Sequence, residues 1–247
     1  KSCQGRCDGQ GRIKSDSAGT SLVLLPFLGA GQTHLVGRYK GVVSHGLRWL
    51  TDRQKADGDL RALSEGNAGM YAHGQATIVL CEAFAMTGDE QLRGPAQRAV
   101  DFIVRAQHIG GGWRYEPGQP GDTSVLGWQL MALKSGHMAY LQVNPDTIKN
   151  ASKFLDSVQA NSGAHYGYKG PGVSTATTAI GLLCRMYLGW KKDHPPLQRG
   201  VEWLSNQGPS ANNMYYNYYA TQVMRHYDGD PWKKWNSVMR DQLVNSQ

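Results

Sequence analysis

The fold is decided by a helical stretch that ends in glutamine and is followed by glycines and a tryptophan. The stretch is Ala99-Val100-Asp101-Phe102-Ile103-Val104-Arg105-Ala106-Gln107, which leads into Gly110-Gly111-Gly112-Trp113. The same order of an aromatic residue, an aliphatic residue and a spaced glutamine recurs along the chain at Trp49-Leu50 with Gln54, Phe154-Leu155 with Gln159 and Trp203-Leu204 with Gln207. A fifth, partial copy without the aromatic residue reaches Gln247. Self-similarity at a period of roughly 40–50 residues predicts stacked helical hairpins.

A second series of segments alternates with the first. Five apolar stretches rich in small residues each reach a closing glycine, at 20–31, 71–88, 123–136, 175–189 and 216–229. Glycine favours the end of a helix because it adopts the left-handed conformation cheaply. These stretches are apolar nearly all round, which predicts buried helices, whereas the glutamine-bearing segments are amphipathic and predict outer helices. We therefore predict an all-α fold of about five hairpins in one domain, 18–247, after a glycine-rich head, 1–17.

Composition excludes several classes of protein. The 247 residues carry a formal net charge of +7, with 40% hydrophobic and 18% charged residues, which is typical of a globular chain. A transmembrane helix needs about 20 apolar residues, but the longest apolar run covers only 22–28 and contains Pro26. Residues 1–7 lack the apolar core of a signal peptide, and the basic residues are scattered rather than clustered for nucleic acid. The cellular compartment is left open.

The four cysteines divide into two pairs. Cys81 and Cys184 lie in apolar helical segments and are predicted to be small buried residues. Cys3 and Cys7 have a CxxxC spacing, which fits an ordinary loop pair, a disulfide or two ligands of one metal ion. Two ligands do not make a structural zinc site, so no metal site and no cofactor are expected.

The repeat resembles the QW-type repeat of the prenyltransferase and squalene–hopene cyclase superfamily. Residues 99–113 match that repeat fully and the other copies match in part, over about 18–247. The resemblance implies an α/α toroid, commonly of six hairpins, with the active cavity at the N-terminal ends of the inner helices. Five hairpins would make either an incomplete ring or one part of a longer protein. An incomplete ring exposes an apolar flank, which favours a homodimer.

The two catalytic sets of that superfamily are not matched. The cyclases protonate an alkene with a DxDD motif, and the equivalent stretch is Gln119-Pro120-Gly121-Asp122-Thr123, which keeps only the last aspartate. The protein prenyltransferases hold zinc with an Asp, a Cys in a DxC motif and a distant His. The sequence contains no DxC, and Tyr215-Tyr216-Asn217-Tyr218-Tyr219 stands near the expected histidine.

Alignment of the inner helices on their closing glycines predicts which residues surround the mouth of the cavity. The candidates for catalysis are Asp122, Glu116 and His73. The candidates for ligand binding are Tyr71, Trp113, Arg114, Tyr115, Trp128, Thr175, Tyr215, Tyr216 and Tyr219. Each also has a structural interpretation. Asp122 is a good N-cap for the following helix, His73 fits a hydrogen-bonded core histidine, and the tyrosines fit packing between helices.

Three functions follow from these residues. The leading one is a divergent toroid domain whose aromatic-lined cavity binds an isoprenoid-like or other apolar ligand, with catalysis left open. The second is an interaction module of an envelope or secreted protein, with its cavity filled by its own side chains. The third is a glycan-active enzyme, a hydrolase using Asp122 and Glu116 or a lyase using His73, Tyr115 and Arg114.

Overall fold

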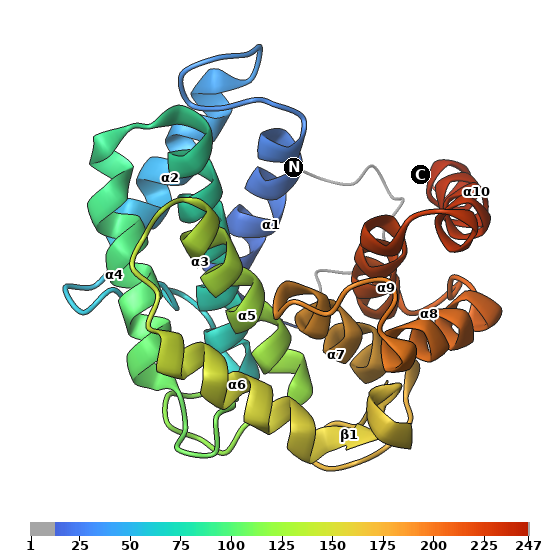
Figure 1. Cartoon of the computed structure of the whole chain (residues 1–247). Helices are drawn as coiled ribbons and strands as arrows, with labels where there is room; N and C mark the ends of the chain where they lie inside the picture. Colours follow the sequence, from blue (N-terminus) through green and yellow to red (C-terminus); the bar gives the residue numbers. More distant parts are fainter. Residues whose placement is uncertain (1–12, 247) are drawn as a thin grey trace.

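The structure, a computed structural model, describes residues 13–246, and within them the chain is all-α (Figure 1). Its inner helices are α1 (Asp16–Gly29), α3 (Gly69–Thr87), α5 (Thr123–Met138), α7 (Thr175–Tyr187) and α9 (Met214–Tyr227). Its outer helices are α2 (Lys40–Arg53), α4 (Glu90–Ala106), α6 (Pro145–Val158), α8 (Pro195–Gln207) and α10 (Asp230–Asn245). The remaining elements are two short 3-10 turns, η1 (Gly66–Ala68) and η2 (Asn161–Gly163), and a two-stranded antiparallel ribbon of β1 (Gln159–Ala160) and β2 (His165–Tyr166). Cys3 and Cys7 lie outside the described range.

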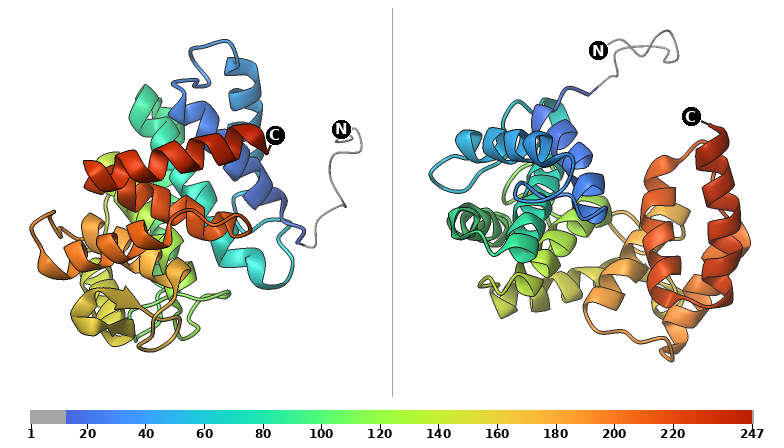
Figure 2. Two further views of the ribbon diagram at one scale, coloured as in Figure 1. Left: turned by 90° about the vertical axis from the view of Figure 1, so that its right-hand side faces the viewer. Right: turned by 90° about the horizontal axis from the view of Figure 1, so that it is seen from above.

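The helices form five hairpins in an arc. Each inner helix packs against the next inner helix, from α1 through α3, α5 and α7 to α9, and each outer helix covers the outside. Most of α3 and α5 is buried, as their apolar composition predicts, and Cys81 and Cys184 are both buried in inner helices. The two ends of the arc, α1 with α2 and α9 with α10, stand apart in Figure 1 and in the right-hand view of Figure 2.

The repeated glutamines join neighbouring outer helices. Gln54 lies at the C-cap of α2 and donates from Nε2 to the carbonyl oxygens of Gly58, at 3.3 Å, and Pro95 of α4, at 2.9 Å. Gln107 at the C-cap of α4 repeats this pattern, with Gly111 at 2.8 Å and Thr147 of α6 at 2.9 Å. One amide group therefore closes its own loop and holds the beginning of the next outer helix. This role accounts for the glutamine in these two repeats.

The glycine four residues after Gln54, Gln107 and Gln159 allows the loop to approach the next outer helix. Gly58 and Gly111 have φ of +91° and +87°. A Cβ at Gly58 would lie 2.0 Å from the carbonyl oxygen of Arg98, and one at Gly111 would lie 2.0 Å from that of Asn150. Gly163, with φ of +88°, holds the equivalent position in the third repeat. Neither the conformation nor the distance suits a side chain.

One predicted helix end is wrong. Gly136 does not close its helix, because α5 continues to Met138 and Tyr140 takes the left-handed conformation instead, with φ of +58°. Gly136 is a packing residue, since a Cβ there would lie 2.9 Å from Cγ2 of Val100. Gly88 does end α3 in the left-handed conformation, as predicted.

Replacing Gln107 with alanine is expected to lower the free energy of unfolding by about 2 kcal/mol. The variant loses two partly buried hydrogen bonds, each worth about 1 kcal/mol, and leaves two carbonyl groups without their donor. Urea denaturation followed by circular dichroism measures the change. Gln91→Ala on the exposed face of the same helix is the control. Equal losses in the two variants would contradict the role given to Gln107.

Candidate functional site

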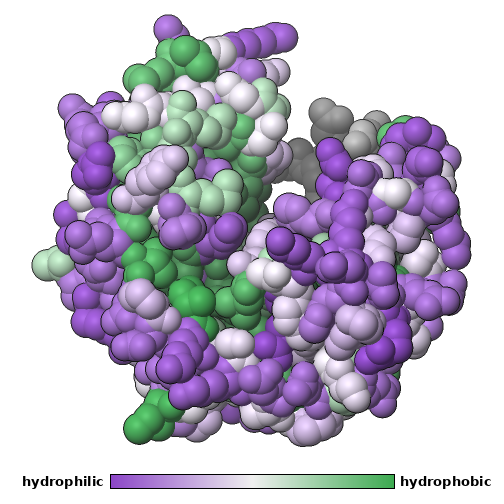
Figure 3. Space-filling view, viewed as in Figure 1, coloured by the Kyte–Doolittle hydropathy of each residue, from purple (hydrophilic) through white to green (hydrophobic). Residues whose placement is uncertain are grey.

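A cavity of about 1000 Å³ lies inside the arc. It lies between the inner helices α1, α3, α5 and α9 and is bordered by η1 and by the loop before α5. Its walls combine aromatic, aliphatic and a few polar side chains: Ile13, Lys14, Ser15, Ala18, Leu22, Glu65, Gly66, Asn67, Ala68, Tyr71, Gln75, Tyr115, Trp128, Met214, Tyr215 and Tyr218. Figure 3 shows the molecule hollowed between the half that carries α1 and the half that carries α9, with hydrophobic residues beside the hollow.

A second space of about 370 Å³ extends the cavity toward the C-terminal ends of the inner helices. Tyr218 lines both spaces. Tyr71 and Gln75 of α3 line the first space, and Ile78, Glu82 and Met86 line the second. Their spacing of three to four residues places all five residues on one face of α3. This face therefore follows the central space over the length of the helix.

Two aromatic groups form much of the cavity wall. The indole of Trp128 on α5 stacks on the ring of Tyr218 on α9, with centroids 5.1 Å apart and an angle of 21°. Across the cavity mouth, the rings of Tyr71 and Tyr115 lie 6.3 Å apart. Tyr215 also lines the cavity. Rings of this size give an elongated apolar molecule a large contact area.

Asp122 caps α5, as the sequence predicted. It is fully buried, and its Oδ1 accepts hydrogen bonds from the backbone N–H of Val125, at 2.9 Å, and from the hydroxyl of Ser124, at 2.7 Å. Its Oδ2 accepts a hydrogen bond from the hydroxyl of Tyr168 at 3.0 Å. The Nε of Arg114 lies 3.7 Å from the same oxygen. The buried carboxylate is thus surrounded by donors.

Hydrogen bonds connect Asp122 with three phenols of the cavity wall. The hydroxyl of Tyr71 lies 2.5 Å from that of Ser124, and the hydroxyl of Tyr115 lies 2.7 Å from that of Tyr168. Tyr215 donates to the carbonyl oxygen of Ser124 at 3.2 Å. Burial raises the pKa of Tyr71 and Tyr215 well above the usual range of a phenol. Both phenols therefore keep their protons near neutral pH.

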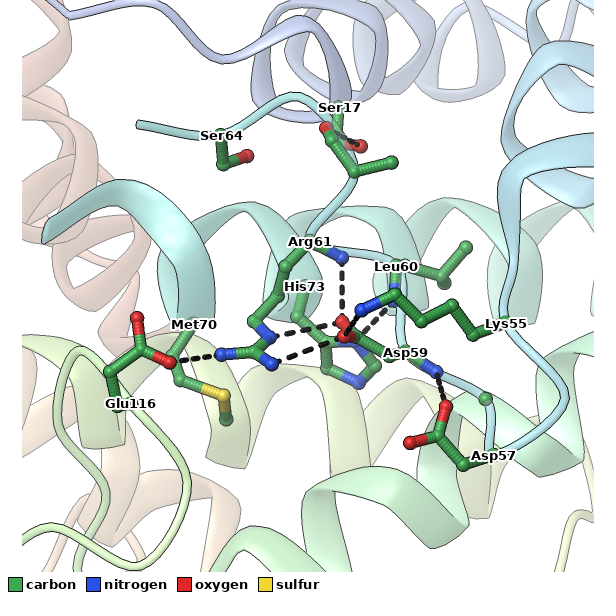
Figure 4. Close-up of polar contacts among 12 residues, drawn as sticks. Ser17, Lys55, Asp57, Asp59, Leu60, Arg61, Ser64, Met70, His73 and Glu116 are labelled. Atoms are coloured by element: carbon green, nitrogen blue, oxygen red, sulfur yellow. Dashed lines mark hydrogen bonds and ion pairs between the residues drawn. The ribbon is translucent and has the colours of Figure 1, made fainter. Parts of the chain in front are cut away.

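The other two catalytic candidates take part in structural interactions. Glu116 is half-exposed and forms an ion pair with Arg61, which also donates to both oxygens of the buried Asp59, at 3.0 and 3.1 Å (Figure 4). Burial alone would raise the pKa of Asp59, but hydrogen bonds from Arg61 and Lys55 lower it to about 2. This cluster joins the loop before η1 to the loop before α5. Glu116 itself lies outside the cavity lining.

His73 is fully buried beneath the same loop. Its Nδ1 accepts a hydrogen bond from the backbone N–H of Leu60 at 3.1 Å, and Nε2 lies 3.0 Å from the carbonyl oxygen of Ala99. Because Nδ1 is the acceptor, we assign the proton to Nε2. Burial lowers the pKa of His73 to about 4, although the contact with Ala99 opposes the shift. Both nitrogens are thus committed to the backbone, away from the cavity.

The structure separates the predicted binding residues into two groups. Tyr71, Tyr115, Trp128 and Tyr215 line the cavity, whereas Trp113, Arg114, Thr175, Tyr216 and Tyr219 lie outside its lining. The buried indole of Trp113 donates to the carbonyl oxygen of Ile103 at 2.8 Å. Tyr216 faces α10, where its ring meets Trp235, and Tyr219 packs against the edge of Trp128.

The sequence analysis also missed residues of the site, among them Gln75, Tyr218 and Tyr168. Gln75 and Tyr218 line the cavity, and Tyr168 connects Tyr115 with Asp122. Gln75 lies four residues after Tyr71, and Tyr218 lies three after Tyr215, so helical spacing could have indicated both. The position of Tyr168, in the loop before α7, carries no such local signal.

The described part of the chain gives two further findings. Within residues 13–246, no group of three or more His, Cys, Asp or Glu side chains is arranged to hold a metal ion. None of the helices in this range is long and apolar enough to cross a membrane.

The comparisons with known proteins give no relative. The chain matches no family model and no curated protein.

Proposed function

We propose that this domain binds an elongated apolar molecule, isoprenoid-like in character, in the cavity inside the arc. The observation that carries the proposal is the cavity itself, with about 1000 Å³ of space and walls that include Tyr71, Tyr115, Trp128 and Tyr218. This volume is at the upper end of the range for small-molecule sites, which are mostly apolar with a few polar groups. The side chains of residues 13–246 leave this space unfilled.

The proposed family is the one that the repeat resembles. We propose that the five hairpins are a divergent α/α-toroid domain of the prenyltransferase and squalene–hopene cyclase superfamily. The contacts of Gln54 and Gln107 support this reading, since they give the repeated glutamine one structural task in two successive repeats. The proposal covers binding and not catalysis, because Asp122 accepts three hydrogen bonds and lies in an ion pair with Arg114, and Glu116 is paired with Arg61.

A bulky side chain that fills the cavity should weaken binding of the apolar ligand. Isothermal titration calorimetry with geranylgeraniol, a twenty-carbon isoprenoid alcohol, is expected to give one site with a Kd of about 20 µM, from about 0.3 kcal/mol per non-hydrogen atom. Ala18→Trp on α1 places an indole in the cavity and should weaken binding at least about tenfold. The control is Val23→Trp, at an exposed position of α1 outside the lining. Lack of binding by the unaltered protein, or equal binding by Ala18→Trp, would refute the proposal.

A further inference from the structure

The hydrogen bonds around Asp122 fix the direction in which the cavity phenols donate. A serine or tyrosine hydroxyl has one hydrogen. Ser124 gives its hydrogen to Oδ1 of Asp122, so in the contact between Ser124 and Tyr71 the donor must be Tyr71. Tyr168 gives its hydrogen to Oδ2, so in its contact with Tyr115 the donor must be Tyr115.

All three phenols connected with this network therefore direct their hydrogens away from the cavity. Tyr71 and Tyr115 donate toward Asp122 through one intermediate hydroxyl each, and Tyr215 donates to the backbone of Ser124. The phenol oxygens keep only lone pairs for any further hydrogen bond. A ligand group that meets them must therefore be a donor, and a phosphate or diphosphate finds no donor among these three phenols.

The side-chain amide of Gln75 is a second polar group in the same cavity. The side chain is 6% exposed and lines the cavity one helical turn beyond Tyr71. Within residues 13–246 the Oε1 of this amide is buried without a donor. A buried carbonyl oxygen without a donor costs free energy that a ligand can recover. An amide can both donate and accept, so it suits a group that does the same.

The charges of the lining argue against an ionic ligand. Lys14 and Glu65 are its two charged residues in the described part of the chain, and they offset each other. An ammonium group could donate to the phenol oxygens, but taking its charge out of water into this mostly apolar cavity costs free energy that the lining, whose two charges offset each other, does not return. A hydroxyl both donates and accepts, and it carries no charge.

We infer that the ligand of this cavity is an uncharged alcohol, with its hydroxyl donating to the phenol oxygen of Tyr71 or Tyr115 and its apolar chain against Trp128 and Tyr218. This inference deepens the proposed function and rests on it, because it specifies the polar end of the apolar ligand.

A panel of ligands with one chain and different ends tests the inference. Geranylgeraniol, its methyl ether and its diphosphate are titrated into the unaltered 247-residue chain by calorimetry. The alcohol should bind about fivefold more tightly than the ether, which lacks the donor, and at least about tenfold more tightly than the diphosphate. Equal binding of alcohol and ether, or tightest binding of the diphosphate, would overturn the inference and leave the proposed function intact. Binding of none of the three would refute both.

An isosteric variant tests the direction of the hydrogen bonds. In Asp122→Asn, the contacts with Val125 and Ser124 hold the amide oxygen at the Oδ1 position, so the amide nitrogen takes the Oδ2 position and donates to Tyr168. Tyr168 then donates to Tyr115, which can donate into the cavity. Asparagine caps helices as well as aspartate does, so folding should be preserved.

Asp122→Asn reverses Tyr115 but leaves Tyr71 donating to Ser124. If the alcohol donates to Tyr115, the preference for alcohol over ether should fall from about fivefold to about twofold or less in this variant, and if it donates to Tyr71, the preference should fall in Tyr71→Phe instead. Tyr227→Phe, at the C-terminal end of α9 and outside the cavity lining, should leave the preference unchanged. An undiminished preference in both Asp122→Asn and Tyr71→Phe, each folded, would contradict the assigned direction.

Discussion

Replacing Gly111 with alanine is expected to lower the free energy of unfolding by about 4 kcal/mol. The residue has φ of +87°, which costs a side chain about 1 kcal/mol or more. The added Cβ would also lie 2.0 Å from the carbonyl oxygen of Asn150 and 2.6 Å from its carbonyl carbon. Because both are backbone atoms, no side chain can rotate away, and the loop after α4 must separate from α6. Overpacking of this kind typically costs about 1–3 kcal/mol.

Gly118→Ala separates the two causes of this loss. Gly118 also has a positive φ, of +73°, but a Cβ there would meet nothing within 4 Å. Its variant should therefore lose only the conformational part, about 1 kcal/mol. Urea denaturation of both variants gives the comparison. A loss at Gly111 no greater than the loss at Gly118 would show that the close contact between the loop and α6 is not a requirement of the fold.

Acidification should destabilise the protein by about 3 kcal/mol through His73. Its pKa is about 4 in the folded protein and 6.5 without the fold, so the unfolded chain binds the proton first as pH falls. The stabilisation is complete above pH 6.5 and is lost as pH decreases from about 6.5 to about 4. A pKa difference of this size corresponds to about 3 kcal/mol. The pKa of Asp59, about 2, adds a further loss only below about pH 4.

The contribution of His73 is measured as a difference between two proteins. His73→Gln removes the titrating group and retains an acceptor and a donor. The free energy of unfolding is measured at pH 7 and pH 4.5 in the unaltered protein and in the variant. The unaltered protein should lose about 2–3 kcal/mol more over this range than the variant does. His165 and His226, whose pKa values are also lowered by burial, contribute to both proteins and cancel. Equal pH dependence in both proteins would contradict the assignment.

The hairpins could be predicted because their signals are local. Apolar stretches of helical length alternate with amphipathic ones, and each stretch can be recognised from its own residues alone. The end of α5 could not be predicted in this way. Gly136 resembles a closing glycine, but it is required by the side chain of Val100, which approaches from α4. A glycine for a turn and a glycine for a close contact look alike in the sequence.

The sequence indicated which helix ends surround the site, but not which of their side chains face it. Alignment of the inner helices on their closing glycines correctly predicted that Tyr71 and Tyr215 line the cavity. It did not give the rotation of each helix about its axis. Tyr216 is adjacent to Tyr215 and consequently faces α10 instead. The part of α1 that lines the cavity was missed because the predicted helix began at Thr20, whereas α1 begins at Asp16 and contributes Ala18.

A crystal structure of the chain grown with geranylgeraniol tests the central claim most directly. We expect continuous density for the isoprenoid chain between α1, α3, α5 and α9, against the stacked pair of Trp128 and Tyr218, with the hydroxyl within hydrogen-bond distance of the Tyr71 or Tyr115 oxygen. A cavity closed by its own side chains, or a ligand bound elsewhere on the chain, would contradict the account.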